Sequence, residues 1–101
     1  MKDDKILTKH PLGKSGKNID KRKYDAVKKA ILSALRKKAL THDELFERLD
    51  RSLTGKFDGS IHWYGETVKL DLEARKIIQR NAAKPAKYRL KSATPRQAKA
   101  R

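Results

Sequence analysis

The stretch from residue 60 to residue 90 places the strongest constraint on the fold of this chain. Apolar side chains recur at helical intervals through its first half, and this pattern passes directly into two short strand-like runs. The runs cover residues 76–81 and 87–91, and a basic turn that contains Pro85 separates them. A helix that leads straight into a small hairpin is therefore predicted at this end of the domain.

Two further helices are predicted upstream of that stretch. Asp20 is a suitable N-cap for a first helix at residues 21–38, where apolar side chains recur three and four residues apart. Thr41 and Glu44 form a capping-box pattern, in which each side chain bonds the backbone amide of the other residue, and this pattern begins a second helix. Residues 39–41 also suit a very short strand that pairs with the hairpin.

The third helix is predicted to begin after a cap at Ser60 and to be mostly buried. Its apolar arc is wide, and the helical spacing places Trp63 in the core. Asp71 and Arg75 lie four residues apart within this arc, which predicts a semi-buried ion pair. The strip that remains for solvent contains His62, Glu66, Lys69 and Glu73.

The composition indicates one small domain with polar ends. Only 37% of the 101 residues are hydrophobic, so the core must be small. We expect a flexible basic arm at residues 1–19, the folded domain at residues 20–91 and a disordered basic tail at residues 92–101. The chain has no cysteine, no ligand-type spacing of its three histidines and no membrane-spanning apolar run. A cytoplasmic protein without metal or cofactor is the expectation.

The charge distribution points to a polyanionic partner. The formal net charge is +15, and the residues after Glu73 contain ten basic groups and no acidic group. By contrast, residues 39–75 are mildly acidic, so the positive charge is concentrated on the first helix, the hairpin and the two ends. Such a distribution attracts polyanions and accelerates their capture.

Three segments of the sequence together carry a family resemblance that covers about residues 10–90. They are His10-Pro11 before Lys23-Tyr24-Asp25, then Ala30-Ile31-Leu32 leading to Leu40-Thr41 and Glu44-Leu45, and finally Trp63, the run from Val68 to Arg75, and Tyr88-Arg89-Leu90. In these segments the chain resembles a small bacterial winged-helix family of uncharacterised function. The resemblance implies an α+β, mainly α fold, in which a three-helix bundle carries a small C-terminal β-hairpin wing, and it implies no established activity.

The hairpin holds the best candidates for nucleic-acid binding. Arg80, Lys84, Lys87 and Arg89 are expected on its outward face and tip, where they can lie along a phosphate backbone. The alternative is a solvated strand edge whose lysines only discourage aggregation.

Contacts from the third helix are weaker candidates. His62 and Lys69 could reach a groove of the nucleic acid, but Glu66 and Glu73 share their strip and phosphates repel carboxylates. Binding through backbone phosphates is therefore favoured over base reading.

No arrangement of catalytic residues is present in the sequence, so we do not expect an enzyme. The leading hypothesis is a monomeric protein that binds double-stranded DNA, with a role in transcription regulation or DNA architecture and without a membrane or small-molecule partner. Two alternatives remain open. One is a protein-interaction module that docks an acidic partner, and the other is an RNA-binding or ribosome-associated protein.

Overall fold

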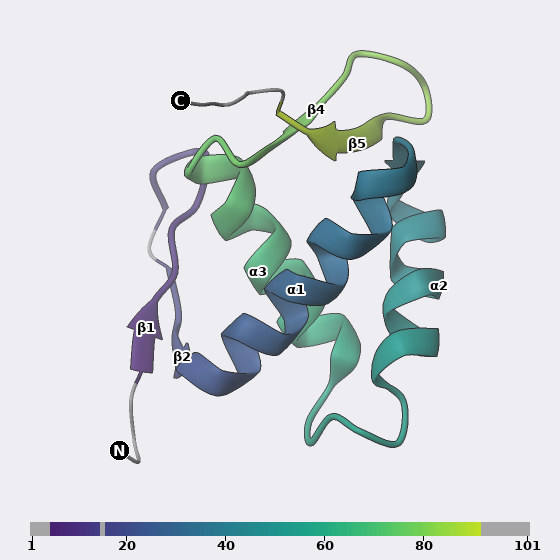
Figure 1. The fold of residues 1–101 in the computed structure, drawn as a ribbon. Coiled ribbons are helices and arrows are strands. Elements are labelled where there is room, and N and C mark those ends of the chain that lie inside the picture. The colour runs from purple at the N-terminus through teal and green to yellow at the C-terminus, as the bar shows by residue number, and fades with distance from the viewer. Residues whose placement is uncertain (1–4, 15, 92–101) are drawn as a thin grey trace, which may run out of the picture.

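The computed structural model describes residues 5–14 and 16–91 (Figure 1). Within these residues the chain forms three helices and two small antiparallel sheets, an α+β fold that is mainly helical, as predicted. The helices are α1 (Lys21–Lys37), α2 (His42–Leu53) and α3 (Ile61–Ala74). The strands are β1 (Lys5–Leu7), β2 (Asn18–Asp20), β3 (Leu40–Thr41), β4 (Ile78–Arg80) and β5 (Lys87–Leu90).

Each helix begins at the cap that the sequence predicts. The Asp20 carboxylate accepts a hydrogen bond of 2.8 Å from the Arg22 amide at the start of α1. Thr41 and Glu44 complete the capping box of α2, with bonds of 3.2 Å to the Glu44 amide and 2.9 Å to the Thr41 amide. The Ser60 hydroxyl accepts a bond of 3.0 Å from the amide of Trp63 in α3. These bonds satisfy amides that the helix itself leaves without partners.

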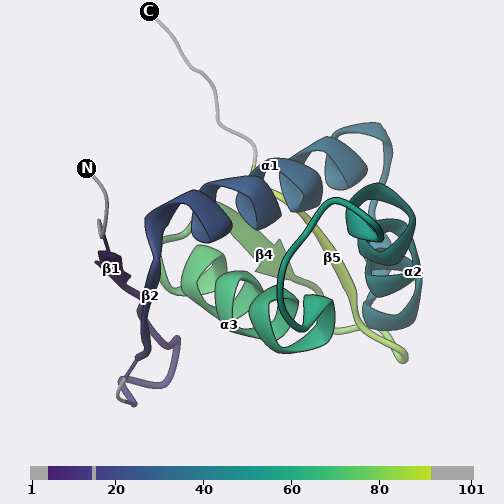
Figure 2. The ribbon, with the colours of Figure 1, turned by 90° about the horizontal axis from the view of Figure 1, so that it is seen from below.

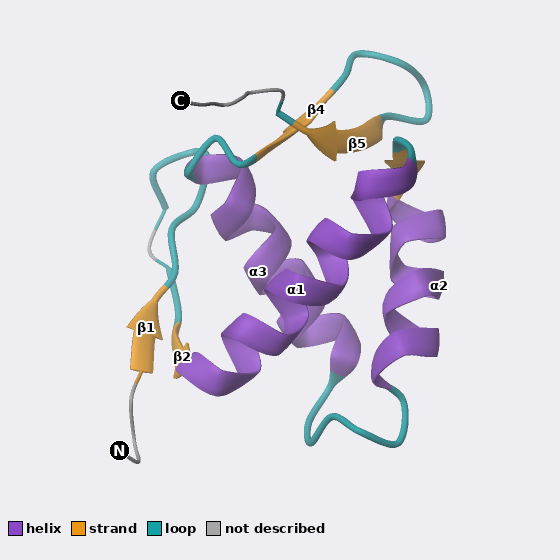
Figure 3. Ribbon diagram, in the orientation of Figure 1, coloured by secondary structure: helices purple, strands orange, loops and turns teal. Residues whose placement is uncertain are grey.

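The three helices pack around one core, and the larger sheet lies across one end of the bundle (Figure 1). Figure 1 shows α1 crossing α3, and Figure 2 shows β4 and β5 behind the helices. The sheet has the order β3–β5–β4, which confirms the short strand predicted near residue 40. Figure 3 shows that the loop between α2 and α3 lies at the opposite end of the bundle from this sheet. Among the fully buried side chains are Val27, Ile31, Leu40, Leu45, Leu49, Val68, Leu72 and Ile78.

The N-terminal segment forms a hairpin that the sequence analysis did not predict. β1 and β2 pair antiparallel, with Ile6 opposite Ile19, where only an extended arm was expected. Ile19 enters the core, whereas Leu7 is exposed. Hydrogen bonds between Thr8 and Lys17 join the two ends of the loop between the strands. Gly16 is required beside them because a Cβ atom at this position would lie 1.6 Å from the Thr8 carbonyl oxygen. The predicted tail at residues 92–101 lies outside the described residues.

Candidate nucleic-acid interface

The solvent-facing side of the larger sheet carries a row of cations on β5. Side chains alternate between the two faces of a strand, and Tyr88 is buried against the core. Lys87 and Arg89 therefore project outward, and both are exposed. Lys91 continues the alternation directly after β5, where its amide donates a bond of 3.0 Å to the Ile77 carbonyl. We call Lys87, Arg89 and Lys91 the outer row; its neighbours are roughly 7 Å apart along the strand.

No ion pair neutralises the outer row in the part of the chain that the structure describes. One member of the row, Lys87, acts electrostatically on the carboxylate of Glu44 at the start of α2. The pKa of Glu44 lies below its usual value, chiefly because its carboxylate accepts the Thr41 amide bond, and the charges of Lys38 and Lys87 add to this effect. As far as residues 5–14 and 16–91 are concerned, the row therefore presents unpaired positive charge to the solvent.

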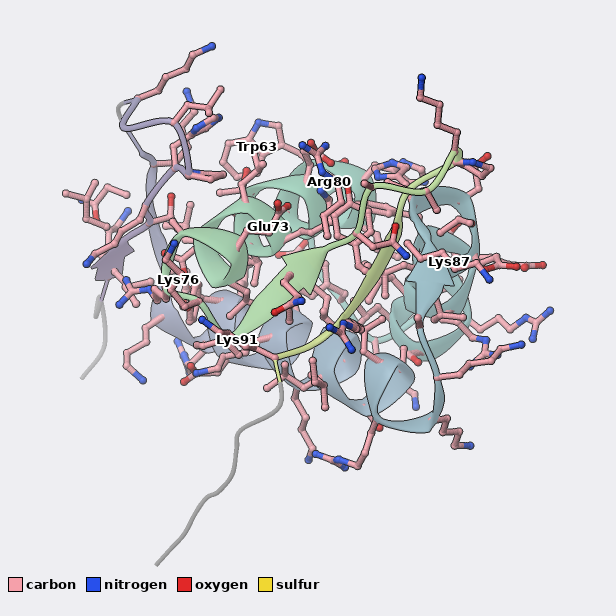
Figure 4. The ribbon with its side chains drawn as sticks, turned by 90° about the horizontal axis from the view of Figure 1, so that it is seen from above. Trp63, Glu73, Lys76, Arg80, Lys87 and Lys91 are labelled. Carbon is pink, nitrogen blue, oxygen red and sulfur yellow. The ribbon has the colours of Figure 1, made fainter. Side chains whose placement is uncertain are left out.

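Arg80 does not share the face of the outer row, contrary to the sequence prediction. In the register of the sheet it lies opposite Tyr88, and paired residues project from the same face of an antiparallel sheet. Arg80 therefore emerges on the α3 side of β4, whereas Lys87 projects from the opposite face of the sheet (Figure 4). Lys84 is exposed in the turn between β4 and β5. The four predicted cations are thus divided between the two sides and the tip of the hairpin.

Lys69 is buried, so the prediction that it lies on the exposed strip of α3 is wrong. The residue is only 3% exposed, and its ammonium group donates to the Glu73 carboxylate at 3.2 Å and to the Tyr88 hydroxyl at 3.3 Å. The ammonium also lies 4.3 Å from the centroid of the Tyr88 ring. The ring of Tyr88 on β5 covers the lysine, and its hydroxyl accepts one of the hydrogen bonds that a buried ammonium group requires.

The exposed side of α3 is therefore aromatic and acidic rather than basic. His62 is exposed, as predicted, but it lies 3.7 Å from the Asp50 carboxylate. Trp63 is 44% exposed, although its helical spacing predicted a place in the core. Glu66 is also exposed, near His42 at 3.9 Å. With Lys69 removed from this side, α3 offers little to attract a phosphate.

Asp71 fixes the C-terminal half of α3 to the rest of the domain. Its carboxylate is fully buried and accepts bonds from Arg75 Nε at 2.8 and 2.9 Å, from the Lys9 amide at 2.8 Å and from the Tyr24 hydroxyl. The ion pair with Arg75 was predicted, and the other two contacts were not. Burial, followed by the bond to Asp71, raises the pKa of Tyr24, and the bond to Asp71 raises the pKa of Arg75.

Lys91 is a cation of this surface that the sequence analysis did not select. The signal was present, because Lys87, Arg89 and Lys91 alternate with Tyr88 and Leu90 along one strand pattern. The predicted binding residues included Lys87 and Arg89 of this pattern and did not include Lys91. Its backbone bond to Ile77 extends the pairing of β5 beyond Leu90, and this keeps Lys91 in line with the row.

Neither a metal centre nor a membrane span emerges from the described residues. Residues 5–14 and 16–91 bring together no group of three or more His, Cys, Asp or Glu side chains that could hold a metal ion. In the same part of the chain, no helix combines the length and the apolar character that crossing a bilayer requires.

Comparison with known proteins assigns the chain to a family. Residues 5–88 match a family of unknown function, DUF6958. The chain belongs to this family. Its description names neither a fold nor an activity, so the resemblance to a winged-helix family stays a prediction. No curated protein and no solved structure matches the chain.

Proposed function

We propose that this DUF6958 member is a winged-helix protein that binds double-stranded DNA mainly through backbone phosphates, in a regulatory or architectural role. The element order α1–β3–α2–α3–β4–β5 supports the winged-helix assignment, because a three-helix bundle carries a three-stranded sheet at one end. In this assignment the wing is the hairpin of β4 and β5.

The observation that carries the proposal is the outer row. Three cations project from one exposed face at regular spacing, and within the described residues none of them has a carboxylate partner. Lys and Arg side chains in such an arrangement bind phosphates and release condensed counterions, which supplies affinity without base specificity. The aromatic and acidic side of α3 gives no comparable support for reading bases, so the proposed binding is independent of sequence.

A salt titration against a random-sequence duplex tests the proposal. The logarithm of the association constant should fall with the logarithm of the salt concentration, with a slope on the order of −4. A slope near zero would overturn the proposal. Competition by a structured RNA, measured in the same assay, separates duplex DNA from RNA as the preferred ligand.

Two matched variants locate the binding surface. Arg89→Gln removes one charge from the outer row and should weaken binding and reduce the size of the slope by about 1. Lys56→Gln removes the same charge from the loop between α2 and α3, at the opposite end of the bundle (Figure 1), and should leave both unchanged. Equal effects of the two variants would mean that only net charge matters and that the outer row is not the interface.

The exposure of Trp63 favours one second candidate, a protein-interaction module. Aromatic side chains are enriched at protein interfaces, and Trp63 is 44% exposed next to the acidic Glu66 side of α3. Under this function one protein would co-purify after nuclease treatment, and Trp63→Ala would abolish its capture. A capture that nuclease removes would instead support nucleic-acid binding.

A further inference from the structure

The outer row leads into a cationic hollow at the free edge of β4. The hollow has a volume of about 340 Å³, and its lining includes Glu73, Lys76, Gln79, Arg80 and Lys91. Figure 4 shows Lys76 and Lys91 near the start of β4 and Arg80 near its end, with Glu73 of α3 alongside. Lys91 therefore belongs to both the outer row and the hollow, which makes the two features one continuous surface.

The charges around the hollow favour an anion. No carboxylate within the described ranges forms an ion pair with Lys76, Arg80 or Lys91. Glu73 is the one acidic group in the lining, and the buried ammonium of Lys69 bonds it at 3.2 Å. Because Lys69 offsets Glu73, three cations remain to bind a ligand.

The backbone of β4 adds a donor at the same place. The bonds from Asn81 to Lys87 and from Lys91 to Ile77 alternate along the ladder, so the amide of Arg80 points away from β5. β4 is the edge strand of its sheet, and this amide therefore lies on the open edge. A guanidinium group and an N–H group from one residue suit a tetrahedral oxyanion.

The backbone of Lys76 provides an independent indication of function. Lys76 follows α3 with a φ of 67°, in the left-handed region that favours glycine. The Lys76 amide donates to the Glu73 carbonyl at 3.1 Å and the Ile77 amide to the Leu72 carbonyl at 2.9 Å, which is the helix ending that usually uses glycine. A lysine here disfavours the fold relative to glycine. Such residues concentrate at functional sites, and the side chain of this one lines the hollow.

We propose that the hollow is a phosphate-binding site in which Lys76, Arg80 and Lys91 hold one phosphate group. The identity of its ligand rests on the proposed function: the phosphate belongs to a DNA strand that follows the outer row, either as an internal phosphodiester or as a terminal phosphate. The site itself requires only phosphate chemistry, and inorganic phosphate is sufficient to test it.

The first experiment is a titration of the full chain with inorganic phosphate, followed by backbone amide NMR. The amides of Lys76, Arg80 and Lys91 should shift together with one dissociation constant. Lys76→Gly and Arg80→Gln should each weaken that constant by about tenfold, as expected for the loss of a charge-assisted contact. Lys56→Gln should not change it. Shifts spread over all basic residues, or a Lys76→Gly protein that binds like the wild type, would overturn the site.

Lys76→Gly also controls for misfolding, because glycine suits the backbone at this position. Its urea midpoint should be higher than that of the wild type, so a loss of phosphate binding cannot come from unfolding. A lower midpoint would contradict the argument from the backbone of Lys76.

The second experiment compares duplexes that carry a 5′-phosphate or a 5′-hydroxyl group. If the two duplexes bind with equal affinity and Lys76→Gly weakens both to the same extent, the ligand is an internal phosphodiester. A preference for the 5′-phosphate that Lys76→Gly abolishes indicates a terminal phosphate. The two proposals can fail separately. A flat salt slope for duplex binding, together with NMR shifts confined to the hollow, would reject DNA binding alone. A steep salt slope without those shifts would reject the phosphate site in the hollow alone.

Discussion

At the scale of single residues, Asp71 joins three parts of the chain through one buried carboxylate. It accepts bonds from Tyr24 on α1, from Arg75 at the end of α3 and from the backbone of Lys9 beyond β1. Asp71→Asn should lower the free energy of unfolding by about 3 kcal/mol, because Arg75 loses its counter-ion inside a closed network. Urea unfolding followed by the fluorescence of Trp63 measures the change.

Asp25 provides the matched control for this prediction. It also forms an ion pair four residues along a helix, with Lys21 at 2.9 Å, but both side chains are about half exposed. Solvent screens such a pair, so Asp25→Asn should cost less than about 1 kcal/mol. If the two variants lose similar amounts of stability, the buried network does not hold the domain together in the way described.

The burial of Lys69 and the exposure of Trp63 could not be predicted from the sequence. Helical periodicity places Lys69 on the wet side and Trp63 on the dry side of α3, and the structure reverses both. The burial of Lys69 depends on the ring and hydroxyl of Tyr88, which are 19 residues away in sequence. Periodicity registers only neighbours on the same helix, so it cannot detect a partner supplied by a later strand. The Asp71–Arg75 pair was predictable because both partners lie on one helix turn.

At the scale of elements, the start of α2 makes the stability of the domain depend on pH. Thr41→Ala removes the N-cap and should lower the free energy of unfolding by about 1 kcal/mol.

The pKa of Glu44 is lower in the folded state than its ordinary value of 4.5. The stability that the Glu44 carboxylate contributes is therefore present above that value and is lost as the pH falls through the folded pKa. Glu44→Gln should therefore be less stable than the wild type at neutral pH, and the difference should close in acid.

Chemical denaturation at a series of pH values measures this difference. Glu47→Gln is the control, because Glu47 lies on the same helix and its carboxylate pairs with the exposed Arg51 at 3.2 Å. If the difference in the free energy of unfolding between Glu44→Gln and the wild type stays constant from neutral to acidic pH, the carboxylate charge does not strengthen the cap.

The helices and strands also differ in how well they can be predicted from the sequence. α1, α2 and α3 were predictable because their caps and apolar spacing are encoded within a few residues of each start. The pairing of β1 with β2 was not, because it joins three-residue strands across a ten-residue loop with few apolar side chains. For the candidate site, the alternation on β5 was visible in sequence. The side of the hairpin on which Arg80 emerges was not, because it depends on the register of β4 against β5.

At the scale of the whole molecule, the proposed interface and the exposed tryptophan lie in different places. The outer row belongs to the sheet at one end of the bundle, whereas Trp63 lies in the first turn of α3, towards the other end (Figure 1). A protein that inserted α3 into a groove would bring Trp63 close to the nucleic acid. A protein that binds through the outer row and the hollow would keep it in water.

Two fluorescent reporters distinguish these orientations. Trp63 is the only tryptophan, and the absence of cysteine allows a single dye at Gln79→Cys, which lies opposite Arg89 in the sheet. At saturating duplex, the dye should change its emission and Trp63 should not, because the charges that attract phosphate surround residue 79 and not α3. If the duplex quenches Trp63 and leaves the emission of the dye unchanged, α3 faces the duplex and the outer row is not the interface.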